Sequence, residues 1–205
     1  MTAPQAAVTG QSASSNVGRI GVKFFVRGPG HVDKTALIAV FHEWIQLGRL
    51  NRLLIDVADY THVHHGPGVV LIAHEGQYSM DQGAGRPGLQ YQQTRWSGGS
   101  VRKRLFNLFD TTLTACQQLE QEDDLAGTVR FRTDEILFRV TDRLLAPNTD
   151  DVARAWCSAL GSLLTKLYRD ATFSLERDTS SSALTIHVSA SASPGIRTLM
   201  ERLSM

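Results

Sequence analysis

The sequence lacks the marks of several large protein classes. It has two cysteines among 205 residues, and neither Cys116 nor Cys157 belongs to a CxxC pair or a zinc-spaced cluster. We therefore expect buried free thiols rather than disulfides or a zinc finger. The longest apolar runs, such as residues 69–73, are far shorter than the roughly 20 residues of a transmembrane helix. The N-terminus lacks the basic region and apolar core of a signal peptide. These absences predict a soluble, cytoplasmic protein without a membrane span.

The sequence also has almost no excess of charge of either sign. Lys and Arg total 21, Asp and Glu total 20, and the formal net charge is +1. A dedicated nucleic-acid-binding domain usually carries a clear basic excess, so the composition argues against nucleic acid as a partner. Hydrophobic residues make up 42% and charged residues 20%, which is ordinary for a globular protein and excludes wholesale disorder.

No complete catalytic motif is present. There is no GxSxG elbow and no HExxH pair of histidines. The segment from Gly28 to Thr35 resembles a phosphate-binding loop, because it lies between a predicted strand and a predicted helix and ends in Lys-Thr. However, Asp33 stands where that motif needs its second glycine, which would place a carboxylate beside the phosphates. We interpret Asp33 as a helix N-cap, and nucleotide hydrolysis is not expected.

The first part of the chain has the pattern of a βαβββα unit. Apolar runs bounded by glycine and proline predict strands at residues 22–26, 53–57, 69–78 and 89–96. Helical spacing of apolar residues predicts helices at 33–48 and 100–119. The run at 53–57 is almost uniformly apolar, which is typical of a strand buried on both faces.

Beyond residue 126 the pattern is more regular and predicts a ββαββα unit. Alternation of apolar and polar residues predicts strands at 129–131, 136–140, 173–175 and 184–188, with a helix from Asn148 or Asp150 to 167. Pro194, at a first helical position, begins a terminal helix. Alternation indicates a sheet with one dry face and one wet face. The wet face, which either binds an acidic partner or is simply solvated, carries Arg130, Arg132, Arg139, Thr185 and His187.

Together these patterns predict an α+β fold. We expect a mixed sheet with helices in the first half and an antiparallel sheet covered by helices in the second half. Residues 1–20 are small and polar and predict a flexible N-terminal arm. The two predicted lobes span residues 21–125 and 126–205, and a single continuous domain is the alternative.

A histidine-rich loop is the first candidate site. His62 and His64 point to the same side if the loop is extended, and His74 reaches that side if the strands flanking the loop pair. Imidazoles with carboxylates nearby suit zinc, manganese or non-haem iron. We therefore predict a divalent metal site formed by His62, His64 and His74. Two other interpretations stay open, namely a solvated loop and acid–base chemistry by His74, Glu75 and Tyr78.

The basic start of the long helix is the second candidate site. Ser100 caps this helix, and Arg102, Lys103 and Arg104 lie in its first turn, where the helix dipole disfavours cations. One interpretation is an anion site in which Arg95, Arg102 and glycine-exposed N–H groups receive a phosphate or carboxylate. We predict anion or partner binding through Arg95, Ser100, Arg102, Lys103 and Arg104.

The opposite end of the same helix suggests a second interpretation. It is acidic, again against the dipole, and carries Glu120, Glu122, Asp123 and Asp124. A helix that is basic at one end and acidic at the other pairs antiparallel with its own copy across a two-fold axis. Assembly is therefore an alternative to anion binding, and a solvated charged surface is the third interpretation.

Three stretches carry a resemblance to other proteins. The motifs FHEWIQ at 41–46, LIDVADY at 54–60 and GPGVVLI followed by HE at 66–75 resemble an uncharacterised family of bacterial cytoplasmic proteins. The resemblance covers the chain up to about residue 95. It implies a bacterial, cytoplasmic setting and brings no activity, cofactor or catalytic residue with it.

These observations lead to two hypotheses for function. The first is a non-catalytic binding or assembly protein that forms a homo-oligomer or a subunit of a larger complex. The alternative is a metal-dependent enzyme that acts on a small anionic substrate, with the three histidines as ligands and the Arg95–Arg104 region holding the anion.

Overall fold

The protein is built on one antiparallel sheet. The computed structural model describes residues 17–28, 32–64, 66–125, 127–169 and 171–205, and in these residues eight strands pair in the order β2-β3-β4-β5-β1-β6-β8-β7. The strands are β1 (Ile20–Val26), β2 (Leu54–Asp59), β3 (Val69–Ala73), β4 (Gly76–Asp81), β5 (Gly88–Gln93), β6 (Phe131–Val140), β7 (Phe173–Arg177) and β8 (Leu184–Ala190). The α+β class is confirmed. The predicted mixed sheet is wrong, because every neighbouring pair is antiparallel.

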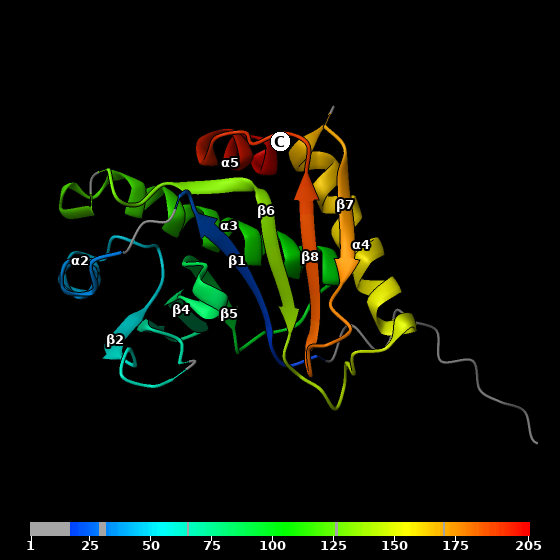
Figure 1. Cartoon of the computed structure of the whole chain (residues 1–205), viewed down its shortest axis with the longest axis horizontal. Coiled ribbons are helices and arrows are strands. Elements are labelled where there is room, and N and C mark those ends of the chain that lie inside the picture. The colour runs from blue at the N-terminus through cyan, green and yellow to red at the C-terminus, as the bar shows by residue number, and fades with distance from the viewer. Residues whose placement is uncertain (1–16, 29–31, 65, 126, 170) are drawn as a thin grey trace, which may run out of the picture.

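Helices cover one face of this sheet (Figure 1). They are α2 (Lys34–Leu47), α3 (Val101–Gln121), α4 (Asp150–Tyr168) and α5 (Ile196–Ser204), with short 3-10 turns at Gly83–Gly85 and Asp123–Leu125. Apolar side chains from all four helices and from alternate strand positions form one hydrophobic core. None of the helices in the described residues is both long and apolar enough to cross a membrane.

The helix boundaries follow the capping residues of the sequence. The Asp33 carboxylate accepts hydrogen bonds from the Thr35 and Ala36 N–H groups, and Gly48 ends α2 with a positive φ of 61°. The Ser100 hydroxyl accepts the Lys103 N–H at the start of α3. Both predicted caps are confirmed. Pro194 does not begin α5, because Gly195 is the N-cap of that helix.

Strand β1 joins the two predicted lobes. It pairs with β5 on one side and with β6 on the other, so residues on both sides of the predicted boundary share one sheet. Residues 1–16 of the predicted arm lie outside the described residues. Val17, which we placed in that arm, is 2% exposed and belongs to the hydrophobic core.

Two strand predictions in the first half are wrong. The predicted strand at 69–78 is two strands, because the chain turns at His74 and Glu75 and pairs β3 with β4. The strand at 53–57 is not buried on both faces. It is β2, at one end of the strand order, and Leu53 and Ile55 are 68% and 55% exposed. An apolar run alone does not distinguish a central strand from an edge strand.

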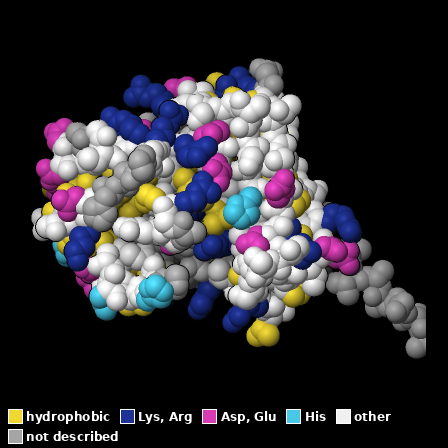
Figure 2. Space-filling view, viewed as in Figure 1, with side chains coloured by type: hydrophobic (Ala, Val, Ile, Leu, Met, Phe, Trp, Pro, Cys, Tyr) yellow, Lys and Arg dark blue, Asp and Glu magenta, His cyan; other side chains and the backbone are white. Residues whose placement is uncertain are grey.

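No helix covers the opposite face of the sheet in the described residues. Gly21, Lys23 and Phe25 alternate along β1 with core residues and lie on this face. Figure 2 shows basic and acidic side chains interspersed over it, rather than gathered into a field of one sign. Lys23 is nevertheless only 2% exposed, because its ammonium group bonds Asp81 at 2.7 Å and the Arg86 carbonyl at 2.7 Å.

Candidate functional site

Four of the predicted site residues, His62, His64, His74 and Arg95, line two hollows at opposite ends of β3. The first, the His62 hollow, lies beside the loop 60–68 that precedes β3. The second, the Arg95 hollow, lies beside the turn that follows β3. His62 comes before β3 in the chain and His74 comes directly after it, so the two histidines flank opposite ends of this strand. Five strand residues separate the two ends by roughly 16 Å.

This separation bears directly on the predicted metal site. His62 and His64 line the first hollow and His74 lines the second. Among the described residues, no three His, Cys, Asp or Glu side chains lie close enough together to hold a metal ion. The structure therefore does not bring His62, His64 and His74 together. The two strands pair as the metal prediction required, but His62 and His74 flank the same strand, β3, and therefore lie at its opposite ends.

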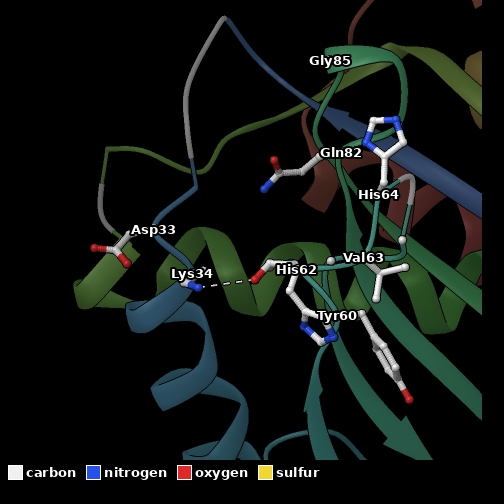
Figure 3. Close-up of a pocket in the computed structure, with 12 residues that line it drawn as sticks. Asp33, Lys34, Tyr60, His62, Val63, His64, Gln82 and Gly85 are labelled. Atoms are coloured by element: carbon white, nitrogen blue, oxygen red, sulfur yellow. Dashed lines mark hydrogen bonds between the residues drawn. The ribbon is translucent and has the colours of Figure 1, made fainter.

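The His62 hollow is the larger of the two, with a volume of about 870 Å³. Lys34 reaches into it from the first turn of α2, and Gln82 extends from the turn between β4 and β5 (Figure 3). Lys34 bonds the Thr61 hydroxyl at 3.4 Å and pairs with Asp59 at 3.7 Å. The hydrogen bonds that Thr61 donates lower the pKa of Asp59 and keep it charged. The ammonium group in this hollow is therefore already opposed by a carboxylate.

The Arg95 hollow has a volume of about 470 Å³ and lies between strand ends and the start of α3. Its wall is formed by Arg52, His74, Glu75, Gln93, Arg95, Trp96, Ser97 and Asn107. The Arg95 and Thr94 N–H groups both donate to the Glu75 carbonyl, at 3.0 and 2.9 Å. These bonds place the segment after β5 beside the β3–β4 turn. The hollow thus brings together one residue from each predicted site, His74 and Arg95.

Three polar side chains of the Arg95 hollow have no partner in the described part of the chain. The one carboxylate, Glu75, pairs through Oε2 with Arg52. The guanidinium of Arg95, the imidazole of His74 and the amide of Asn107 make no hydrogen bond or ion pair within the described residues. The hollow is therefore rich in free donors, and it holds two guanidinium groups against one carboxylate.

Arg104 contributes to this hollow indirectly. It is 1% exposed, donates from Nε to Gln93 Oε1 at 2.8 Å, and donates to the carbonyl groups of Val17 and Gly18. Because Arg104 occupies the Gln93 oxygen, the Gln93 amide nitrogen is the end that is free to donate. The internal acceptors of the Arg104 guanidinium leave it with few donors for the anion or partner that we predicted it to bind.

The remaining residues of the predicted basic site have different surroundings. Ser100 serves as the helix cap, whereas Arg102 and Lys103 are exposed and do not line the hollow. At the acidic end, Glu120 accepts the Phe131 N–H at 2.7 Å and Glu122 accepts the Trp44 indole N–H at 2.6 Å.

These internal bonds weaken the case for pairing of α3 with a second copy. The residues of α3 that are fully exposed lie only at its two ends, at Arg102, Lys103 and Gln121, because α4 and α5 pack beside it.

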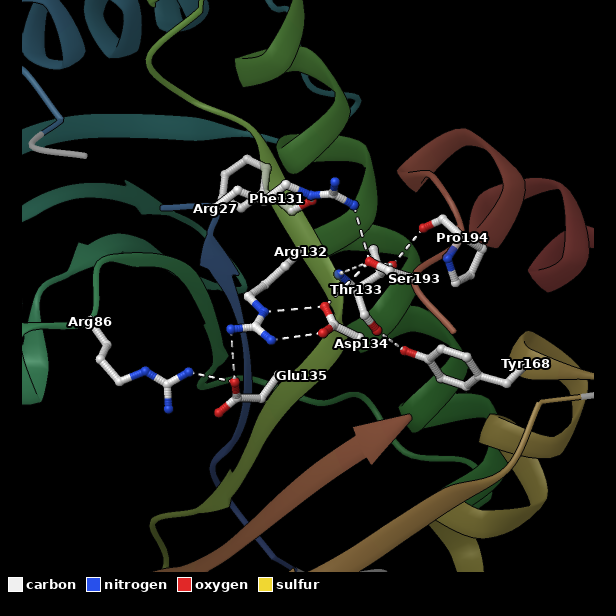
Figure 4. Close-up of polar contacts among 10 residues, drawn as sticks. All are labelled: Arg27, Arg86, Phe131, Arg132, Thr133, Asp134, Glu135, Tyr168, Ser193 and Pro194. Carbon is white, nitrogen blue, oxygen red and sulfur yellow. Dashed lines mark hydrogen bonds and ion pairs between the residues drawn. The ribbon is translucent and has the colours of Figure 1, made fainter. Parts of the chain in front are cut away.

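The arginines of the predicted wet face are mostly paired as well. Arg132 donates to the Asp134 carboxylate at 2.7 Å and forms an ion pair with Glu135 (Figure 4). The Glu135 carboxylate also accepts a hydrogen bond from Arg86 at 2.5 Å. The hydrogen bond from Arg86 lowers the pKa of Glu135. Thr185 is 1% exposed, and Arg130 donates to the Glu120 carbonyl at 2.6 Å. Little of this face is left as a free basic surface.

A buried tyrosine pair lies beneath the Arg95 hollow. The rings of Tyr78 and Tyr91 are 4.7 Å apart, and burial raises the pKa of Tyr91 to about 12. The Tyr91 hydroxyl has no hydrogen-bond partner among the described residues. Only glycine fits above it, since a Cβ at Gly76 would lie 2.9 Å from that hydroxyl and 2.3 Å from the Gln92 carbonyl oxygen.

Five residues of this hollow were not predicted as site residues from the sequence: Arg52, Gln93, Trp96, Ser97 and Asn107. They come from four separate segments, and only the β4–β5 register and the packing of α3 bring them together. The one usable signal was Trp96, an aromatic residue beside Arg95 in a glycine-rich segment.

Comparisons with known proteins do not add a functional assignment. No family model matches the sequence, and a search of curated proteins found no significant match.

Proposed function

We propose that this protein is a non-catalytic binding protein whose ligand is a small organic anion held in the Arg95 hollow. The observation that carries the proposal is the free guanidinium of Arg95, which lies beside the unpaired donors of His74 and Asn107. Guanidinium groups bind carboxylates and phosphates through paired N–H donors. The carboxylate that would otherwise repel an anion, Glu75, is compensated by Arg52.

The size of the hollow favours an organic anion over an inorganic ion. A volume of about 470 Å³ lies within the range of small-molecule sites. The half-buried Trp96 indole supplies an apolar surface for the body of the ligand. The other wall groups are hydrogen-bonding amides and a hydroxyl: Gln93, Asn107 and Ser97.

Trp96 also provides a direct test. The other two tryptophans, Trp44 and Trp156, are 0% and 1% exposed, so a ligand in the hollow should shift only the Trp96 indole N–H signal in a nitrogen-15 NMR spectrum. Titration with succinate and with inorganic phosphate is expected to move that signal saturably, with a dissociation constant of about 1 mM or lower, equivalent to about 4 kcal/mol.

Two substitutions make the test specific. Arg95→Gln should weaken binding at least about tenfold, because a hydrogen bond to a charged group contributes about 1.5–3 kcal/mol. Lys34→Gln, in the other hollow, should leave it unchanged. A Trp96 signal that does not move with either anion, or moves equally in Arg95→Gln, would overturn the proposal.

Assembly is a second candidate function, and a different observation favours it. Leu47, at the end of α2, and Leu53 and Ile55, before and within β2, are 59%, 68% and 55% exposed. Exposed aliphatic side chains of this kind are found in contact surfaces between proteins. Regular sheet extension is disfavoured, because the Asp56 carboxylate accepts the Val57 N–H and the register shifts between Leu54 and Asp56.

We therefore propose side-chain packing between two copies at this surface. Sedimentation should give twice the chain mass of 22.5 kDa for the unaltered protein and a single chain mass for Leu53→Glu. A single chain mass for the unaltered protein contradicts assembly and leaves the anion proposal intact.

A further inference from the structure

The charged groups of the Arg95 hollow offer an acceptor for a cation as well as a donor for an anion. Glu75 bonds Arg52 through Oε2 only, and its other oxygen, Oε1, has no partner among the described residues. The Glu75 carboxylate is half exposed, at 50%, and lines the hollow together with Arg95. One wall therefore carries a free acceptor and another carries a free guanidinium.

Glu75 and Arg95 do not pair with each other, although their backbones are hydrogen-bonded. The ion pairs in the described residues join Glu75 to Arg52 and leave Arg95 without a carboxylate. The Glu75 carboxylate and the Arg95 guanidinium thus both line the hollow without forming an ion pair across it. A molecule that carries both a cation and an anion satisfies both groups at once, whereas a simple anion satisfies only one.

From this arrangement we infer that the ligand is a free α-amino acid or a closely related small zwitterion. Arg95 receives its carboxylate, with the Gln93 amide nitrogen and Asn107 as further donors, and Glu75 Oε1 accepts its ammonium group. The side chain of the ligand lies against the Trp96 indole. The inference rests on the proposed anion-binding function and adds the ammonium group to it.

Arg104 and Arg52 have positioning roles in this site. Arg104 holds the Gln93 oxygen, so that the amide nitrogen donates toward the hollow. Arg52 holds Glu75 Oε2 and so fixes the position of the carboxylate. An ammonium ligand then meets a carboxylate that retains one free oxygen.

Matched ligand pairs test the ammonium group directly. Binding of a panel of L-amino acids would be measured by the Trp96 indole signal and compared with the analogues that lack the amino group, such as aspartate against succinate and alanine against propionate. At least one amino acid is expected to bind tenfold or more tightly than its analogue. In Glu75→Gln that preference should disappear, while succinate binds as well as before or better.

The outcomes separate the two proposals. If succinate binds at Arg95 but no amino acid exceeds its analogue, or if the preference survives in Glu75→Gln, the zwitterion inference is overturned and the anion proposal stands. If neither succinate nor any amino acid moves the Trp96 signal, both are overturned. Thermal unfolding of Glu75→Gln checks that the variant is folded, and Glu43→Gln, an exposed glutamate on α2 outside both hollows, serves as the matched control.

Discussion

The two hollows at the ends of β3 differ in the state of their charged groups rather than in their size. The His62 hollow is nearly twice as large, at about 870 Å³ against 470 Å³, yet its lysine is opposed by Asp59 and its Asp33 caps a helix. The Arg95 hollow has donors that nothing in the described residues satisfies. The comparison teaches that the two hollows differ in how their charged groups are paired, and the anion proposal rests on that difference.

The largest expected effect concerns the support of the Arg95 hollow. Arg104→Met should lower the free energy of unfolding by about 3 kcal/mol or more, because it leaves buried acceptors without a donor, namely the carbonyls of Val17 and Gly18 and the oxygen of Gln93. Urea denaturation measures this change. Arg104→Lys is the control and should lose less, since it keeps one donor and the charge. Equal stability of Arg104→Met and the unaltered protein would contradict the internal role.

The glycines beside the hollows provide a symmetrical comparison. A Cβ at Gly76 would lie 2.3 Å from the Gln92 carbonyl oxygen, and one at Gly68 would lie 2.4 Å from the Met80 carbonyl oxygen. We expect Gly76→Ala and Gly68→Ala each to lower the unfolding free energy by about 2 kcal/mol. Gly195→Ala, where a Cβ meets nothing within 4 Å, should be nearly neutral. A neutral result at Gly76 would show that the β3–β4 turn differs from the structure.

Replacement of the paired Arg86 and of the unpaired Arg95 should change the pH dependence of stability differently. The hydrogen bond from Arg86 lowers the pKa of Glu135, so this pair stabilises the fold above the ordinary glutamate pKa of about 4.3 and the stabilisation is lost as the pH falls through the lower folded-state pKa. Arg86→Gln should therefore reduce the stability difference between neutral pH and pH values near 3, measured by urea denaturation. Arg95→Gln should leave that difference unchanged, and a loss in Arg95→Gln would reveal an ion pair at Arg95.

The smallest expected effect lies in the His62 hollow. The Lys34–Asp59 pair is 3.7 Å long, with side chains 53% and 37% exposed, and exposed ion pairs contribute about 0–1 kcal/mol. Lys34→Gln should change the unfolding free energy by less than about 0.5 kcal/mol. It should also leave succinate binding unchanged. Loss of binding in this variant would reverse the comparison and assign the ligand to the larger hollow.

Local signals in the sequence predicted much of the fold. Asp33, Gly48 and Ser100 marked helix ends because they satisfy terminal backbone groups, and the alternation after residue 130 marked strands β6, β7 and β8. The turn between β3 and β4 escaped prediction because His74 and Glu75 carry no turn signal.

The candidate site was predicted only in part. His74 and Arg95 were both identified, but as members of different sites, because their meeting depends on the β4–β5 register. Arg104 could not be distinguished by sequence from Arg102 and Lys103 beside it, since burial of one of three adjacent cations depends on tertiary packing. The predicted metal ligands His62 and His74 are separated by the length of β3, whose end at Ala73 the apolar periodicity did not mark.

A diffraction experiment with bromide tests the central comparison most directly. Bromide is a monovalent anion, and its anomalous scattering shows its position in the crystal directly. In crystals soaked with sodium bromide, we predict an anomalous peak in the Arg95 hollow near Arg95 and Gln93, absent from crystals of Arg95→Gln. The account predicts no such peak beside Lys34 and His62. A bromide ion in the His62 hollow, with none at Arg95, would contradict it.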